Sequence, residues 1–229
     1  MWKSIIVTKN QIENKDIKKI IDGENSSIII KNFLKKEDCK KIIKKISSMN
    51  IEKDSKKFNH IGPFLMNYTT KKEKYFENAE KANEIFKKIF LNIDNPVSKI
   101  KTTIEKFFPN YEISEIKENQ KKYAMCTIRR HENGKSIPLH KDNVSYEGIE
   151  YDISKINTQL SCILHLQQTE KGGNLSIYNK QWNRELEKYR EIEFGYNPKI
   201  KENASVAVSY THLRAHETDS YLVCRLLLE

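Results

Sequence analysis

Apolar residues recur at helical spacing along the first half of the chain. From Cys39 to Ile46, and again from Lys72 to Ile93, they fall at positions i, i+3, i+4 and i+7, which places them on one face of a helix. A third helix is predicted to open at Asn95 and Pro96, because asparagine is a good N-cap and proline suits the first helical position. Pro109 ends this pattern. We interpret the three apolar stripes as faces buried in a core.

Beyond Pro109 the pattern changes to short runs of β-forming residues separated by turn sequences. The predicted strands are Tyr111 to Ile116, Tyr123 to Arg129, Thr158 to Gln167 and Leu175 to Tyr178. The predicted turns are Glu132-Asn133-Gly134 and Lys171-Gly172-Gly173. Helices followed by strands predict an α+β fold, in which helices pack on one side of an antiparallel sheet or jelly roll. Residues 1–110 would form the mostly helical part, and residues 111–207 the strand core.

The charge of the chain raises the question of a polyanionic partner. Among 229 residues, 41 Lys and Arg stand against 31 Asp and Glu, a formal net charge of +10. The excess is nearly all lysine and accompanies abundant isoleucine and asparagine, the set that AT-rich codons encode. We therefore interpret the lysines as solvated faces and expect no nucleic-acid partner. A basic nucleic-acid-binding protein is kept as an alternative.

Cysteine usage and hydropathy limit the compartment. The four cysteines form no CxxC pair and have no regular spacing, which argues against a zinc ribbon or a disulfide framework. No apolar run approaches the roughly 18 residues that a membrane span needs, and the N-terminus lacks an export signal. We expect a cytoplasmic protein with no membrane partner, and we predict no particular oligomeric state.

Composition changes abruptly at Val208. From there to Glu229 the chain has no lysine and no asparagine, and VSYTHLRAHET followed by YLVCRLLLE resembles two segments of a translated sequencing-library adapter in one reading frame. We predict that residues 208–229 are not native and exclude them from fold and site reasoning. The exclusion covers His212, His216 and Arg225, which would otherwise be tempting as a distal metal ligand and a carboxylate-binding arginine.

The most informative chemistry lies at His140 and Asp142. The two residues are two positions apart, so on an extended segment an imidazole nitrogen and a carboxylate oxygen face the same side and can converge on one ion. Non-haem iron(II) oxygenases use two histidines and one carboxylate on one face of the metal. A His-x-Asp pair alone is a weak signal, because it also occurs in surface loops.

The surrounding sequence makes the pair more specific. The run YAMCTIRRHENGKSIPLHKDN, and after a spacer TQLSCILHLQQTEKGGNLSIY, together resemble the prolyl-hydroxylase-like branch of the 2-oxoglutarate/iron(II) dioxygenases. In that branch a strand leads through a glycine turn, here Gly134, to His-x-Asp, and a second strand follows. A Gly-Gly turn and a return strand come next, matched here by Gly172, Gly173 and Leu175. The resemblance implies a double-stranded β-helix core of the cupin-like jelly-roll type.

The resemblance also implies which residues contact the cosubstrate. Family members often place tyrosines where this chain has Arg130 and Ile137, and another where it has His165. A histidine can still donate a hydrogen bond to a carboxylate, so His165 is the first candidate for contact with 2-oxoglutarate and Arg130 the second. The alternative for His165 is a core histidine, and for Arg130 an exposed charge. We interpret His131 and His60 as surface histidines.

The resemblance implies an enzyme with iron(II) as cofactor and 2-oxoglutarate as cosubstrate that hydroxylates a peptidyl residue or a small molecule. A distal histidine and a downstream basic residue that pairs with 2-oxoglutarate have no counterpart before Val208, so we expect a truncated, inactive chain whose natural form continues. No side chain is assigned as a general acid or base. A second alternative is a catalytically dead jelly-roll protein that binds a peptide or small molecule.

Overall fold

The chain forms two compact units in a computed structural model. The described residues are 2–8, 11, 13–49, 59–131, 136–167, 174–192, 195–201, 205–209 and 221–228. One unit, called here the sheet unit, comprises Met1–Lys36, Ser136–Asp142 and Asn157–Glu229; the other, the helical unit, comprises Glu37–Lys135 and Asn143–Ile156. No helix of the described part is both long and apolar enough to cross a membrane.

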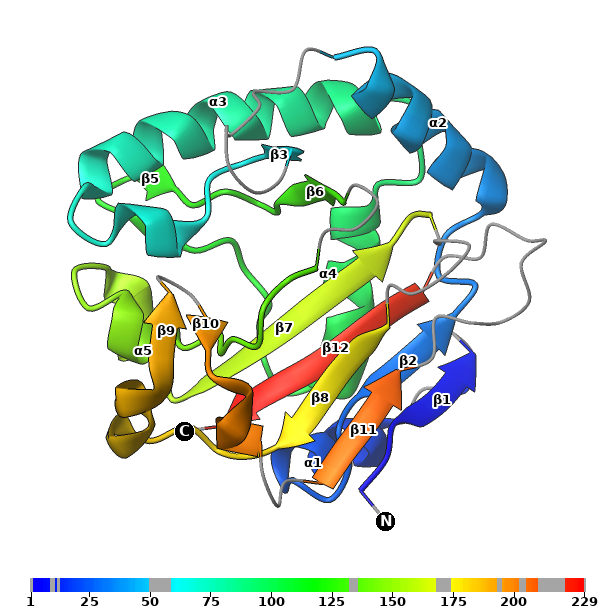
Figure 1. Ribbon diagram of the computed structural model, residues 1–229. Helices are drawn as coiled ribbons and strands as arrows, with labels where there is room; N and C mark the ends of the chain where they lie inside the picture. Colours follow the sequence, from blue (N-terminus) through cyan, green and yellow to red (C-terminus); the bar gives the residue numbers. More distant parts are fainter. Residues whose placement is uncertain are drawn as a thin grey trace. The chain divides into compact units, whose positions relative to one another are not determined.

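A four-stranded sheet is the main element of the sheet unit. Its strand order is β1 (Ile5–Thr8), β2 (Ile28–Lys31), β12 (Tyr221–Leu228) and β7 (Thr158–His165). Strands β1 and β2 are parallel, whereas β12 runs antiparallel to both of its neighbours. Helix α1 (Asn14–Ile21) contacts β2 and β12 and lies behind the sheet in Figure 1.

A second layer of strands covers the other face of this sheet. Strands β8 (Leu175–Asn179) and β11 (Ser205–Ser209) form an antiparallel pair, drawn in front of the four-stranded sheet in Figure 1. Buried Ile29 of β2 packs against Leu175 of β8 and joins the two layers. The unit also holds a small antiparallel pair and two 3-10 helices: β9 (Arg190–Ile192), β10 (Gly195–Tyr196), η4 (Arg184–Tyr189) and η5 (Pro198–Lys201).

Three longer helices dominate the helical unit (Figure 1): α2 (Lys36–Ser47), α3 (Lys72–Phe90) and α4 (Pro96–Phe107). The short elements are β3 (Asn59–Ile61), η2 (Leu65–Tyr68), β4 (Lys117–Glu118), β5 (Lys121–Lys122), β6 (Ile128–Arg130), α5 (Val144–Glu147) and η3 (Asp152–Lys155). Strand β3 pairs with β6, and β4 with β5, both antiparallel. Tyr75, Phe76 and Ala79 of α3 bury an aromatic core together with Tyr151.

The three predicted helices are confirmed. Cys39 and Ile42 of α2 are fully buried, as are Phe86 and Ile89 of α3, so the apolar stripes do face a core. The side chain of Asn95 caps α4, because its Oδ1 accepts from the backbone N of Val97 at 2.9 Å.

The strand predicted from Tyr111 to Ile116 is wrong, since this segment has no strand structure. Tyr111 is 72% exposed and its backbone N donates to Phe108 O at 3.0 Å, in a turn that follows α4. A β-forming composition is therefore not sufficient here, because no neighbouring strand takes up the backbone donors and acceptors.

The strand predicted from Tyr123 to Arg129 is largely wrong, because only β6, from Ile128, forms. The amide of Asn83 on α3 accepts from Met125 N at 2.9 Å and donates to Tyr123 O at 3.0 Å. The Tyr75 hydroxyl accepts from Ala124 N at 3.3 Å. Side chains of a helix thus satisfy the backbone groups that a sheet partner would otherwise bind.

The other two predicted strands are confirmed as β7 and β8, while both predicted turns, at 132–134 and 171–173, lie outside the described residues. The described strands form open layers and no closed barrel, so the jelly-roll core stays a prediction. Part of the segment predicted to be adapter-derived pairs as β12. An apolar octapeptide rich in Leu, Val and Tyr forms a strand whatever its origin, so the predicted origin also stays a prediction.

Gly62, in the helical unit, and Gly23, in the sheet unit, provide a test of close packing at a glycine. Both have positive φ angles, +94° and +73°, but a Cβ at Gly62 would lie 2.8 Å from Cys126 O whereas one at Gly23 would meet nothing within 4 Å. We expect Gly62→Ala to lower the free energy of unfolding by about 3 kcal/mol, and Gly23→Ala by only about 1 kcal/mol from backbone strain. Urea unfolding of both variants measures the difference, and equal losses would contradict the close approach.

Candidate functional site

The segment that carries His140 and Asp142 lies in the sheet unit and is held by local backbone contacts. Leu139 O accepts from Tyr196 N of β10 at 2.9 Å. The imidazole Nδ1 of His140 lies 2.8 Å from Pro138 O, which sets the orientation of the ring. His140 Nε2 then faces Asp142 and lies 3.7 Å from its Oδ1. The predicted convergence of these two side chains is therefore present.

This pair fits a shared metal ion as far as its two donors go. When Nδ1 carries the proton and donates to Pro138 O, the lone pair of Nε2 is available to a metal, the usual arrangement for a histidine ligand. Metal bonds to imidazole and carboxylate of about 2.1 Å each can bridge donors that are 3.7 Å apart. Both side chains remain accessible, with exposures of 32% and 43%. Within the described part of the chain, no cluster of three or more His, Cys, Asp or Glu side chains could hold a metal ion.

The two cosubstrate candidates lie in different units. His165 ends β7 in the sheet unit, where it is half-buried and its Nε2 is shielded from solvent. Arg130 ends β6 in the helical unit, is exposed, and is the register partner of Asn59 in β3. The structure brings His140 and Asp142 together, and the cosubstrate roles of His165 and Arg130 stay predictions. Ile137, the other position where a tyrosine was expected, is 39% exposed.

Two further described histidines, His131 and His60, belong to the helical unit. His131 is an exposed residue. Its pKa is lowered, first by the desolvation of its imidazole ring and then by the nearby Arg129 charge. His60 is half-buried, and its ring centroid lies 4.7 Å from that of Phe64. The prediction of a surface histidine therefore holds only in part for His60. His212 and His216 lie outside the described residues, and of Arg225 only the backbone is described, opposite Ser161.

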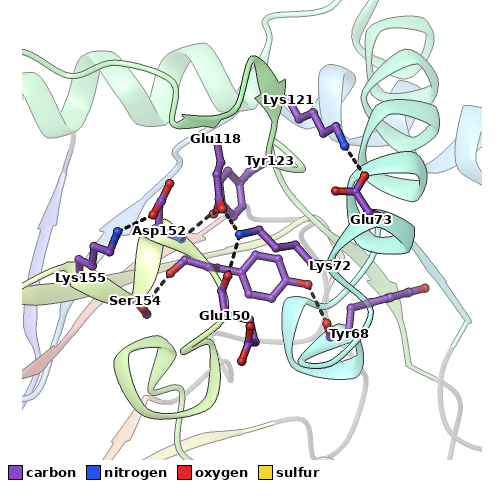
Figure 2. Close-up of polar contacts among 11 residues, drawn as sticks. Tyr68, Lys72, Glu73, Glu118, Lys121, Tyr123, Glu150, Asp152, Ser154 and Lys155 are labelled. Carbon is purple, nitrogen blue, oxygen red and sulfur yellow. Dashed lines mark hydrogen bonds and ion pairs between the residues drawn. The ribbon is translucent and has the colours of Figure 1, made fainter.

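Sequence reasoning missed a buried charged cluster in the helical unit, centred on Glu118 (Figure 2). Glu118 is 3% exposed, and its carboxylate forms an ion pair with Lys72 of α3. Its Oε2 accepts from the Tyr123 hydroxyl at 2.5 Å and from Asp152 N at 2.9 Å. Lys72 Nζ also donates to Glu150 O at 2.7 Å. The cluster therefore fastens the segment around η3 to helix α3.

The pKa values of this cluster agree with a structural role. Burial acts to raise the pKa of Glu118, but hydrogen bonds from Lys72, Tyr123 and Asp152 N outweigh it, and the net pKa is lowered. The pKa of Tyr123 is raised, first by burial and then by its hydrogen bond to Glu118. A carboxylate held by these donors is a stable ion pair rather than a proton donor near neutral pH. No local sequence signal marks it, because Lys72 and Glu118 are distant in the chain.

The family model described as carrier-protein-independent halogenase WelO5 matches residues 1–215. A search of curated proteins gave no match to this chain. The matched range includes His140, Asp142, His165 and Arg130.

Proposed function

Because this chain belongs to the family of the carrier-protein-independent halogenase WelO5, within the iron(II)- and 2-oxoglutarate-dependent oxygenase superfamily, we propose that it carries an oxygenase domain in which His140 and Asp142 bind iron(II). The observation that carries this proposal is the approach of His140 Nε2 to within 3.7 Å of Asp142 Oδ1. The family supports an enzyme with iron(II) and 2-oxoglutarate as its cofactor and cosubstrate.

The residues of the proposed site have separate roles in iron binding and in contact with the cosubstrate. The bound iron supplies the redox chemistry that couples decarboxylation of 2-oxoglutarate to oxidation of a substrate C–H bond. The contact between His140 Nδ1 and Pro138 O orients the imidazole, and Asp142 contributes the negative charge. We propose His165 as a hydrogen-bond donor to 2-oxoglutarate, supported by its place in the same unit, with Arg130 as the second candidate.

The presence of Asp142 supports oxygenation rather than halogenation. With iron bound, a carboxylate ligand such as Asp142 would take up a coordination position that a halide ion would otherwise need. Hydroxylation of a small molecule or a peptidyl residue is therefore the first candidate function. Halogenation is the second, and the description of the matching family favours it.

We propose that the natural protein departs from this sequence near Val208 and continues through a prolyl-hydroxylase-like jelly-roll core with a distal histidine and a basic residue for 2-oxoglutarate. The change in composition at Val208 supports this proposal, as do the two facing layers of strands in the sheet unit. The 229-residue chain would accordingly turn over little 2-oxoglutarate.

Reading the genomic codons after Ala207 and expressing the resulting protein tests this proposal. We expect its iron(II)-dependent release of succinate from 2-oxoglutarate to exceed that of the 229-residue chain by more than about 100-fold, because on this proposal the latter lacks one metal ligand. Robust turnover by the 229-residue chain would contradict the proposal and direct attention to His212, His216 and Arg225. In the presence of chloride, a product that gains oxygen supports the first candidate, and one that gains chlorine supports the second.

A further inference from the structure

The carboxylate of Glu187, in η4, gathers four donors in the sheet unit. Its Oε1 accepts from Lys141 Nζ at 3.0 Å and from Trp182 Nε1 at 2.8 Å, and it also accepts from the Tyr196 hydroxyl. Its Oε2 lies 3.1 Å from Arg190 Nε. Glu187 is therefore held by contacts on both carboxylate oxygens.

One of these donors, Lys141, lies between the two proposed metal ligands in the sequence. The side chain of Lys141 is only 9% exposed, and its ammonium lies 3.2 Å from the centroid of the Trp182 ring. Lysine is rarely buried without a partner, because removing its charge from water is costly unless a carboxylate or an aromatic face compensates. Glu187 and Trp182 supply that compensation and fix the head of Lys141.

A second tether acts on the same segment. Tyr196 donates its backbone N to Leu139 O at 2.9 Å, and its hydroxyl to Glu187. The segment is thus held through its backbone at Leu139 and through a side chain at Lys141. Lys141 lies between His140 and Asp142 in the sequence, so fixing its side chain restrains the backbone that carries both. On this backbone His140 Nε2 lies 3.7 Å from Asp142 Oδ1.

We propose that Glu187 is a positioning residue for the iron ligands, acting through Lys141 to restrain the backbone that carries His140 and Asp142. This role rests on the proposed function for its effect on metal binding, but the restraint on the segment exists without a metal. Burial acts to raise the pKa of Glu187, yet the hydrogen bonds from Tyr196, Lys141 and Trp182 outweigh it and lower the net pKa, so the carboxylate is charged near neutral pH.

Two substitutions and one matched control test the role. Glu187→Gln and Lys141→Met each remove one charge of the pair while keeping a similar shape. Glu118→Gln is the control, because Glu118 is also a buried carboxylate bound by a lysine, a tyrosine and a backbone N, but in the helical unit. The readouts are ¹⁵N relaxation and amide exchange of residues 139–142 in the metal-free chain, and the affinity of the chain for Co²⁺ by optical titration.

We expect both test variants to raise the rate of amide exchange at residues 139–142. We also expect them to weaken Co²⁺ binding by roughly 10-fold, the smaller of the effects usual when a metal site loses a residue that orients its ligands. Glu118→Gln should lower stability without changing either readout. Unchanged dynamics of residues 139–142 in Glu187→Gln would overturn the positioning role. If that segment loosens while Co²⁺ binding by the parent chain is insensitive to His140→Ala, the positioning role stands and the proposed iron site fails.

Discussion

In the protein expressed from its genomic locus, His140→Ala is expected to lower the rate of iron(II)-dependent succinate formation by more than about 100-fold. Removing an outer-sphere partner of a metal site costs about 10–100-fold, and losing a ligand costs more. The imidazole Nε2 is the donor that faces Asp142, and alanine leaves no nitrogen in its place. Succinate release at saturating iron(II) and 2-oxoglutarate measures the effect.

His131→Ala is the matched control for this prediction. His131 is exposed, so its loss should leave succinate formation within about twofold of the parent protein, as expected for a surface substitution. Retention of half or more of the parent activity by His140→Ala would remove His140 from the iron site. The His-x-Asp motif would then be a surface loop, and the alternative of a catalytically dead binding protein would gain support.

Lys72→Met should lower the free energy of unfolding of the helical unit by about 3 kcal/mol. The substitution keeps most of the side-chain volume but leaves the buried carboxylate of Glu118 without its counter-ion. Breaking a buried ion pair in this way costs about 3–5 kcal/mol, and the low end applies because Tyr123 and Asp152 N still donate to Glu118. Urea unfolding followed by far-ultraviolet circular dichroism, which reports on helices such as α3, measures the loss.

The control for this variant is Lys155→Met, which removes a lysine from a 2.6 Å ion pair with Asp152 in the same unit (Figure 2). Both members of that pair are exposed, at 77% and 56%, so solvent already screens their attraction and no measurable loss of stability is expected. Equal unfolding midpoints for the two variants would show that the Glu118 cluster does not depend on its charge pairing.

Local features of this protein could be predicted from the sequence because they depend on residues close together in the chain. The helical stripes in α2 and α3 need only the 3.6-residue period, and the cap at Asn95 needs only the next two residues. The convergence of His140 and Asp142 also belongs to this class, since two-residue spacing on an extended segment puts both on one side.

The tertiary structure alone decided the features that depend on distant partners. Residues 123–125 form no strand because the side chains of Asn83 and Tyr75 on α3 hydrogen-bond to their backbone groups. The hydrophobic pattern of the sequence does not predict these contacts. Lys141 and Glu187 are 46 residues apart, and each looks like one more surface charge in a lysine-rich chain. Charged side chains reveal a structural role only when folding removes them from water, because burial makes the choice of partner energetically decisive.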